Sequence, residues 1–296
     1  MGAGHDKISG APAWMVFALS RLFSWPALFG PVQAIHKLCW HLMNRTSAGY
    51  LPVTHTGERR VLTDVLAATP SNRPVVVFDC GANLGDYSLL VLAEARRAGR
   101  DVSLQLFEPS NETFQALTQR MAAHHSVARA HCLAVSETSG RLPIYFAWPG
   151  AGGTSLSAAT SWVQGTGTLP LSSADVDAVS LDDFCEREGI THIDLLKMDI
   201  EGAELLGLQG ARRLIERGAI GAVQFELGSA ALPFGVSLYQ FWVRYADQFE
   251  FFVVLAHGSK RIDAYSPDLE CFFGASTFVM RRRTACASAS SVGASS

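Results

Sequence analysis

Residues 75–87 read VVVFDCGANLGDY, an apolar run that ends on the carboxylate of Asp79 and continues into a turn with Gly81 and Gly85. An apolar, β-branched run is typical of a strand buried on both faces of a parallel sheet. The two glycines allow the backbone to turn tightly and to approach a ligand. A strand, an acid at its carboxyl end and a glycine-containing turn form the ligand-binding corner of doubly wound α/β domains, so we expect such a domain here.

Strand-like and helix-like segments alternate on both sides of this stretch. The expected strands are 75–79, 102–107, 127–135, 142–147, 193–199, 222–227, 251–255 and 277–280, and the clearest helices are 86–98 and 203–217. This alternation predicts a mainly parallel sheet with helices on both faces. We expect the last two strands to pair antiparallel, because hairpin-like material separates them.

The chain divides into three expected parts. Residues 1–52 form an apolar helical extension, residues 53–283 form the α/β domain, and the Ala- and Ser-rich residues 284–296 form a tail that we expect to be disordered. Within the domain, residues 148–173 are rich in Gly, Ser, Thr and Pro and predict a long surface loop. A binding loop and a disordered insert are both open interpretations of this segment.

Residues 11–43 of the extension are rich in Trp, Phe and Leu. Arg21, Pro26 and Pro31 interrupt this stretch, so no window reaches the roughly 18 apolar residues that a membrane span requires. A signal peptide fits poorly, because an Asp offsets the one Lys of the first ten residues. The segment is either a pair of amphipathic helices packed on the domain or on a second subunit, or an interfacial membrane anchor. The first interpretation is favoured, because apolar helical stripes usually belong to a core.

Charge and cysteine content restrict the partners and the compartment. The chain has 24 Lys and Arg against 27 Asp and Glu, a net charge of −3, and lacks a long basic run, so nucleic acid is disfavoured as the main partner. The 6 cysteines form no CxxC pair and no cluster with zinc spacing, which is typical of a reducing compartment. We therefore expect a cytoplasmic protein, at most peripheral to a membrane.

Three acids fall at or beside the carboxyl ends of expected strands: Asp79, Glu108 and Asp199. Ligands of open α/β sheets bind outside these strand ends, so we expect the three carboxylates to share one site. Glu108 follows a strand directly and lies about 20 residues beyond the glycine turn. An acid at this position accepts hydrogen bonds from the ribose hydroxyls of a nucleoside cofactor, and we favour this role over that of a solvated loop acid.

The glycine turn distinguishes two classes of cofactor. The dinucleotide fingerprint is GxGxxG, whereas residues 81–86 read GANLGD. Asn83 replaces the glycine that lets the backbone approach a pyrophosphate, and Asp86 places a carboxylate at the third glycine position. S-adenosyl-L-methionine has no pyrophosphate, and its cationic sulfonium suits a corner that contains Asp79. The turn therefore favours the methyl donor over a nicotinamide dinucleotide.

Several blocks of the chain resemble the FkbM family of S-adenosylmethionine-dependent methyltransferases. They are residues 78–88 (FDCGANLGDYS), 107–109 (FEP), 134–136 (AVS) with Gly140, 179–184 (VSLDDF), 193–204 (IDLLKMDIEGAE), 209–211 (QGA) and 225–226 (FE). The resemblance implies a class I, Rossmann-like methyltransferase fold with a mainly parallel seven-stranded sheet whose last strand is antiparallel. It also implies O-methylation of a hydroxyl, commonly on a sugar or a polyketide.

The resemblance further implies roles in the cofactor pocket. Four residues would line the methionine end of the donor: Asp79, Gly81, Asn83 and Gly85. Glu108 would hold the ribose. Three residues would lie near the adenine: Ala134, Val135 and Ser136.

Methyl transfer to a hydroxyl requires a base that takes the proton as the new bond forms. The candidates are Asp199, Glu201 and Glu226, of which Asp199 is favoured because it ends a buried strand beside the expected transfer point. We expect Lys197 to be a charge partner, because a lone buried Lys is unfavourable. Glu204 is attributed to a helix N-terminus, where a carboxylate is favourable.

A metal site and two other functions are weighed against this interpretation. Asp199 and Glu226 offer oxygen ligands of the kind that Mg²⁺ prefers, but the sequence suggests no third ligand, so we expect no metal. A nicotinamide-dependent oxidoreductase is disfavoured by the missing GxGxxG. A catalytically silent, methyltransferase-like interaction module is disfavoured by the three retained strand-end acids. The expected acceptor is a hydroxyl of a small molecule or a glycan.

Overall fold

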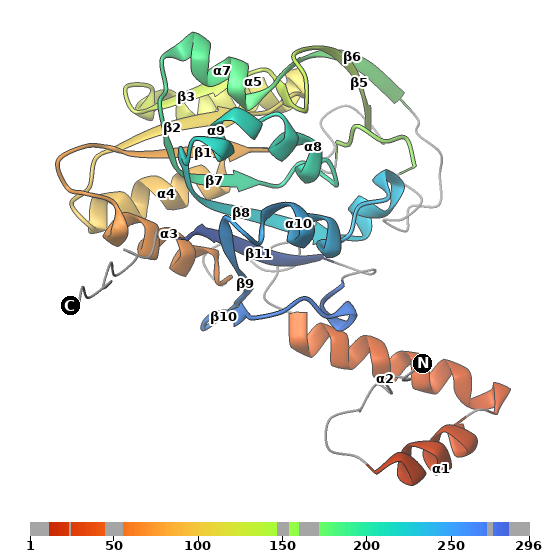
Figure 1. Ribbon diagram of the computed structural model, residues 1–296. Coiled ribbons are helices and arrows are strands. Elements are labelled where there is room, and N and C mark those ends of the chain that lie inside the picture. The colour runs from red at the N-terminus through yellow and green to blue at the C-terminus, as the bar shows by residue number, and fades with distance from the viewer. Residues whose placement is uncertain are drawn as a thin grey trace, which may run out of the picture. The chain divides into compact units, whose positions relative to one another are not determined.

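The computed structural model describes residues 12–23, 25–44, 56–146, 154–159, 172–270 and 275–283. The tail 284–296 and most of the expected loop 148–173 lie outside the described residues. The chain divides into two compact units, residues 1–45 and residues 46–296. The larger unit is built around a twisted sheet with helices on both faces (Figure 1).

The main sheet has the strand order β10, β9, β11, β8, β7, β1, β2, β3. The strands are β1 (Val75–Cys80), β2 (Val102–Phe107), β3 (Ala128–His131), β7 (Ile193–Met198), β8 (Ile220–Gly228), β9 (Phe249–Leu255), β10 (Gly258–Ile262) and β11 (Ala275–Arg282). The central strands β3, β2, β1, β7 and β8 pair in parallel, and β11 is inserted antiparallel between β8 and β9. The expected fold class and the expected antiparallel pairing of the last two strands are confirmed.

The number of strands differs from the expectation. The described part of the main sheet has eight strands instead of seven, because β10 forms a hairpin with β9 at the edge of the sheet. Residues 127–135, expected as one strand, divide into β3 and β4 (Ala134–Val135). β4 belongs to a second sheet with β6 (Ser172–Val179) and β5 (Gly140–Phe146), so the chain leaves the main sheet after β3.

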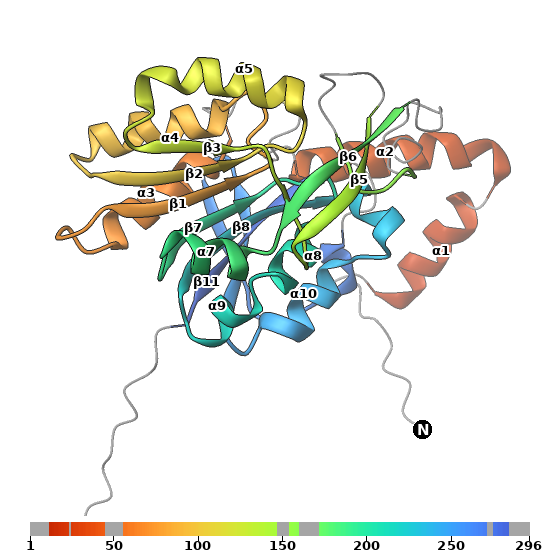
Figure 2. The same cartoon turned by 90° about the horizontal axis from the view of Figure 1, so that it is seen from above.

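Helices cover both faces of the main sheet (Figure 2). On one face lie α3 (Glu58–Ala68), α4 (Asp86–Arg97) and α5 (Asn111–Met121), and on the other lie α7 (Leu181–Glu188), α8 (Glu204–Gln209), α9 (Arg212–Glu216) and α10 (Leu238–Tyr245). The described connections also contain three short 3₁₀ helices: η3 (Ala122–His124), η4 (Ser229–Phe234) and η5 (Pro267–Leu269).

The expected helix 203–217 is broken into α8 and α9. The break falls at Gly210, where a Cβ would lie 2.1 Å from the carbonyl oxygen of Ser136. The carboxylate of Asp182 accepts two backbone N–H groups at the start of α9, at 2.8 and 2.9 Å. Because of this close backbone contact and the new helix cap, residues 203–217 form two short helices although their apolar pattern is continuous.

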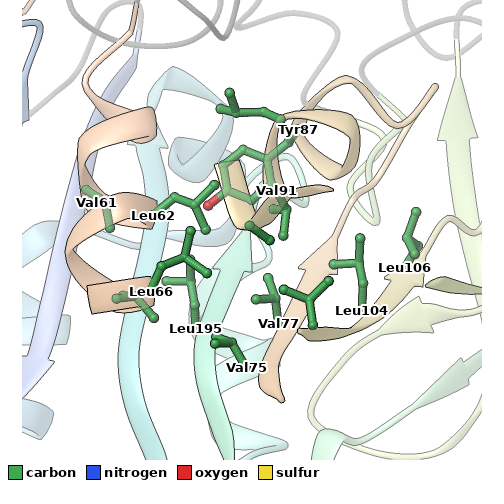
Figure 3. Close-up of a cluster of buried hydrophobic side chains, with 14 of the residues drawn as sticks. Val61, Leu62, Leu66, Val75, Val77, Tyr87, Val91, Leu104, Leu106 and Leu195 are labelled. Carbon is green, nitrogen blue, oxygen red and sulfur yellow. The ribbon is translucent and has the colours of Figure 1, made fainter. Parts of the chain in front are cut away.

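Apolar side chains fill the space on both faces of the central strands. The cluster beneath α3 and α4 includes Val61, Leu62, Leu66, Val75, Val77, Val91, Leu104, Leu106 and Leu195 (Figure 3). On the opposite face, the ring centroid of Phe78 lies 5.7 Å from that of Phe184 on α7, and that of Phe225 lies 4.4 Å from that of Phe241 on α10. Because side chains alternate along a strand, Asp79 shares the α3–α4 face with Val75 and Val77.

The smaller unit contains two helices, α1 (Ala13–Phe23) and α2 (Pro26–Asn44). Pro26 is the first residue of α2, a position where proline is well tolerated. Pro31 lies within α2 and does not end it. Among the described helices, none has both the length and the apolar character needed to cross a membrane.

Candidate functional site

A pocket lies at the carboxyl ends of the central strands β1, β2 and β7. The direction of the strand order reverses between β1 and β7, which is where open α/β sheets bind ligands. Seven predicted site residues line the pocket: Gly81, Asn83, Glu108, Ala134, Val135, Asp199 and Glu201. Four predicted site residues do not line it: Asp79, Gly85, Ser136 and Glu226.

The turn after β1 brings the backbone close to the turn after β7. Gly81, Asn83 and Gly85 all have left-handed φ values, of 78°, 48° and 84°. A Cβ at Gly81 would lie 1.8 Å from the carbonyl oxygen of Asp199, so only glycine permits this approach. Gly85 begins α4 instead of lining the pocket, and a Cβ there would lie 2.8 Å from the side chain of Leu117.

Glu108 connects the end of β2 to this turn. Its two carboxylate oxygens accept backbone N–H groups from Asn83 and Ser110, both at 3.0 Å. Burial raises the pKa of Glu108, and the two backbone hydrogen bonds act against this shift. Each carboxylate oxygen can accept a further hydrogen bond, so Glu108 has the capacity to bind hydroxyl groups in the pocket.

Asp79 lies beneath the pocket. Its side chain is fully buried, and it accepts a hydrogen bond from Ser88 Oγ at 2.7 Å. Lys197 Nζ lies 3.3 Å from Asp79 Oδ1 and 3.4 Å from Asp199 Oδ2, so it connects the buried acid to the acid that lines the pocket. Burial acts to lower the pKa of Lys197, but the carboxylates of Asp199, Asp79 and Glu58 outweigh it and hold the pKa well above its ordinary value. The expected charge partner is therefore present as a buried ammonium ion.

The turn after β7 is held by Glu204, the first residue of α8. Glu204 Oε1 accepts the N–H groups of Ile200 and Gly202, at 2.9 and 3.3 Å. Glu201 has a left-handed φ of 55°, and a Cβ at Gly202 would lie 2.1 Å from the carbonyl oxygen of Ala230. Glu204 thus positions the turn that carries the two base candidates, a more specific role than favourable placement at a helix N-terminus.

Glu204 is expected to make stability fall as the pH rises. Burial raises its pKa from 4.5 to about 8, and its Oε2 has no hydrogen-bond partner among the described residues, which suits a protonated carboxyl. Because the folded pKa is the higher one, the folded state retains a proton between about pH 4.5 and 8 that the unfolded state has released. Its contribution to stability is complete below pH 4.5 and is lost as the pH rises to 8.

Urea unfolding across this pH range tests this prediction. Relative to Glu204→Gln, wild type should lose up to about 1.4 kcal/mol of unfolding free energy per pH unit. The matched control is Glu216→Gln, which alters an exposed acid paired with Arg212 on the surface of α9. A constant difference between wild type and Glu204→Gln would show that Glu204 is ionised in the folded protein.

Glu226 and Ser136 lie outside the pocket lining. Glu226 precedes the end of β8 by two residues. Burial raises its pKa well above the ordinary value, and the carboxylates of Asp199 and Glu201 raise it further. The N–H of Ser136 donates to the carbonyl oxygen of Val179 at 3.1 Å, so Ser136 holds the small sheet together.

Several pocket residues carry no signal in the sequence. Thr113 and Ile144 are examples, since their positions depend on the packing of α5 and of the small sheet. Thr154 and Leu156 also line the pocket, and they belong to the segment for which a binding loop was one of two open interpretations. Between them, Ser155 pairs with the backbone of Tyr145, and its Oγ donates to the carbonyl oxygen of Glu201 at 3.0 Å. Within the described ranges, no group of three or more His, Cys, Asp or Glu side chains has metal-binding geometry.

Comparison with known proteins shows the family. A family model described as the methyltransferase FkbM domain matches residues 79–253. The methyltransferase sdnD of Sordaria araneosa is 28% identical over 169 residues, which cover 49% of this chain and 62% of that protein. The present chain therefore spans less than two thirds of the length of this relative.

Solved structures with similar chain traces include two methyltransferases. The methyltransferase FkbM from Methylobacillus flagellatus KT is 17% identical with a TM-score of 0.41, over 70% of this chain and 43% of that chain. The N-terminal domain of human METTL16 in complex with SAH is 10% identical with a TM-score of 0.42, over 79% of this chain and 72% of that chain. The family match alone covers more than half of the chain and agrees with the blocks recognised in the sequence, so the protein belongs to the methyltransferase FkbM family.

Proposed function

We propose that this protein is an S-adenosyl-L-methionine-dependent methyltransferase that methylates a hydroxyl of a sugar, a glycan or another small natural product. The observation that carries the proposal is one pocket lined both by Glu108 with the turn after β1 and by the acids of the turn after β7. The family match and the relative named a methyltransferase support the reaction type. The two alternatives, a nicotinamide-dependent oxidoreductase and a silent module, are tested by the ligand-binding and product measurements below.

The residues of the pocket fit the donor. The carboxylate of Glu108 has acceptor capacity for both ribose hydroxyls, and Gly81 and Asn83 line the same pocket. In the proposed arrangement, Gly81 and Asn83 contact the methionine part of the donor, and Ala134 and Val135 contact the adenine. Asp79, Gly85 and Ser136 support the pocket walls from behind. When bound, S-adenosyl-L-methionine supplies an activated methyl group on a cationic sulfonium.

Asp199 is the proposed base. Asp199 lines the pocket, and Lys197 Nζ lies 3.4 Å from its Oδ2. It takes the proton of the acceptor hydroxyl as the oxygen–carbon bond forms and the carbon–sulfur bond breaks. Glu201 is the second candidate, because it lines the same pocket. Glu226 is the third candidate: it lies near the end of β8, the strand beside β7, but outside the pocket lining.

Glu108→Gln is expected to weaken donor binding by about 10–100-fold. The amide has one acceptor oxygen where the carboxylate has two, and it offers no charge-assisted hydrogen bond to the ribose. The rise in melting temperature that S-adenosylhomocysteine causes measures donor binding. The rise that NADH causes, measured separately, tests binding of a nicotinamide cofactor. Glu188→Gln, at the end of α7 and outside the pocket lining, is the control. A shift with NADH alone would favour the oxidoreductase.

The acceptor can be identified by mass spectrometry of metabolites. Cells that contain wild type are compared with cells that contain Asp199→Asn, and the acceptor appears as a compound that gains about 14 Da only with wild type. Donor binding without any such product would favour the silent module.

The proposed location is cytoplasmic. Cys39, Cys80, Cys132 and Cys185 form no disulfide within the described part of the chain, which supports a reducing compartment. Nucleic acid is not a proposed partner, because the chain has no excess of Lys and Arg over Asp and Glu.

A further inference from the structure

The helices α1 and α2 expose many large apolar side chains. These are Trp14, Phe17, Leu19, Phe23, Trp25, Phe29, Val32, Ile35 and Leu38. Trp14, Trp25 and Phe29 are 71%, 68% and 69% exposed. Single exposed apolar residues are ordinary, but nine within residues 14–38 indicate a segment that binds a partner or a membrane.

The larger unit offers little apolar surface to cover this series. Its exposed large apolar side chains, within the described residues, are Leu84, Val127, Leu232, Tyr239 and Val243. Of these, Tyr239 and Val243 are one helical turn apart on α10, and the others belong to different elements. Packing of α1 and α2 on the larger unit, the interpretation favoured by the sequence pattern, therefore gains no support from these side chains.

The charge of the segment identifies the kind of surface it fits. Residues 7–57 contain Lys7, Arg21, Lys37 and Arg45 and no Asp or Glu. The whole chain carries a net charge of −3, so the remainder is more negative than the whole. A second copy would bring two positive segments together, whereas an anionic lipid surface attracts both the basic and the aromatic residues.

The residue pattern of α2 suits a helix that lies in the plane of a bilayer surface. At 100° per residue, Val32 and Ile35 fall on one side of the helix, and Gln33 and Lys37 fall on the other. A helix of this kind buries its apolar side among the headgroups and needs no membrane-spanning length. Trp and Phe side chains are suited to this depth, because one part of the ring is apolar and the indole N–H is polar.

We propose that α1 and α2 bind the surface of an anionic lipid bilayer, with Trp14, Trp25 and Phe29 inserted at headgroup depth. The proposal does not depend on the reaction that the larger unit performs, because no residue of its pocket takes part. The bilayer surface would hold the pocket close to acceptors that are attached to or dissolved in the membrane.

Vesicle flotation of the full chain tests the proposal. Wild type should float with phosphatidylcholine vesicles that contain about 30% phosphatidylserine, and much less with pure phosphatidylcholine or at high salt. The double variant Trp14→Ser/Trp25→Ser should float at least tenfold less. The matched control, Tyr239→Ser/Val243→Ser, removes exposed apolar side chains from α10 and should float like wild type.

Light scattering and urea unfolding complete the test. Both double variants should unfold at the urea concentration of wild type, because the changed side chains are exposed. Equal flotation of wild type and the Trp double variant would overturn the proposal. A dimer that the Trp double variant abolishes, together with no binding to anionic vesicles, would assign the surface to a second copy and overturn it as well.

Discussion

Asp199→Asn is expected to lower the rate of methyl transfer by about 10²–10⁴-fold, while the affinity for S-adenosylhomocysteine stays near that of wild type. The amide occupies the same volume but cannot take the proton of the acceptor hydroxyl. Folding should largely persist, because Asp79 still neutralises the buried ammonium group of Lys197. The rate is measured by mass spectrometry on the acceptor, and affinity by calorimetry.

Parallel variants distinguish the three base candidates. Glu201→Gln and Glu226→Gln should retain more activity than Asp199→Asn, because Asp199 combines a place in the pocket lining with the contact to Lys197. Asp263→Asn is the control, since this acid is exposed beside the edge strand β10. If Asp199→Asn loses donor binding and stability together with activity, Asp199 is a structural residue and not the base.

Gly81→Ala is expected to cost more than about 3 kcal/mol of unfolding free energy and to abolish donor binding. The added Cβ would lie 1.8 Å from the carbonyl oxygen of Asp199, at a backbone φ of +78°. The obstacle is main chain, so relief requires separating the turn after β1 from the turn after β7. That separation would move apart the two pocket-lining residues Gly81 and Asp199.

Gly99→Ala separates the effect of a positive φ from the effect of the close backbone contact. Gly99 also has a positive φ, of +61°, but a Cβ there would meet nothing within 4 Å. Its cost should be only the left-handed strain of about 1–2 kcal/mol, with donor binding unchanged. Urea unfolding and calorimetry of both variants provide the comparison. Equal costs would mean that the close approach of the two turns contributes nothing beyond backbone strain.

The sequence was sufficient to predict the central part of the sheet and the end of the sheet at which the pocket lies. The apolar run before Asp79 and the glycine turn after it predict β1 and the ligand-binding end, because burial on both faces and left-handed turns leave clear residue preferences. The contact between Lys197 and carboxylates was also predictable, since a buried ammonium ion requires a charged partner. These features depend on local chemistry.

Features that depend on tertiary contacts were not predictable in the same way. The break between α8 and α9 occurs where Gly210 lies against the carbonyl of Ser136, and no local sequence pattern indicates this contact. The three acids looked equivalent in the sequence, but Asp79 lies inside β1, where Ser88 of α4 binds it, whereas Glu108 and Asp199 follow the last residues of β2 and β7 and line the pocket. The pocket residues Thr113 and Ile144 come from elements whose packing alone places them there.

Calorimetric titration of the full wild-type chain with S-adenosylhomocysteine tests the central claim most directly. If the pocket at the carboxyl ends of β1, β2 and β7 is built for the adenosyl donor, the titration will show saturable heat with one site per chain. Well-folded protein that releases no heat with either S-adenosylhomocysteine or S-adenosyl-L-methionine would contradict the account.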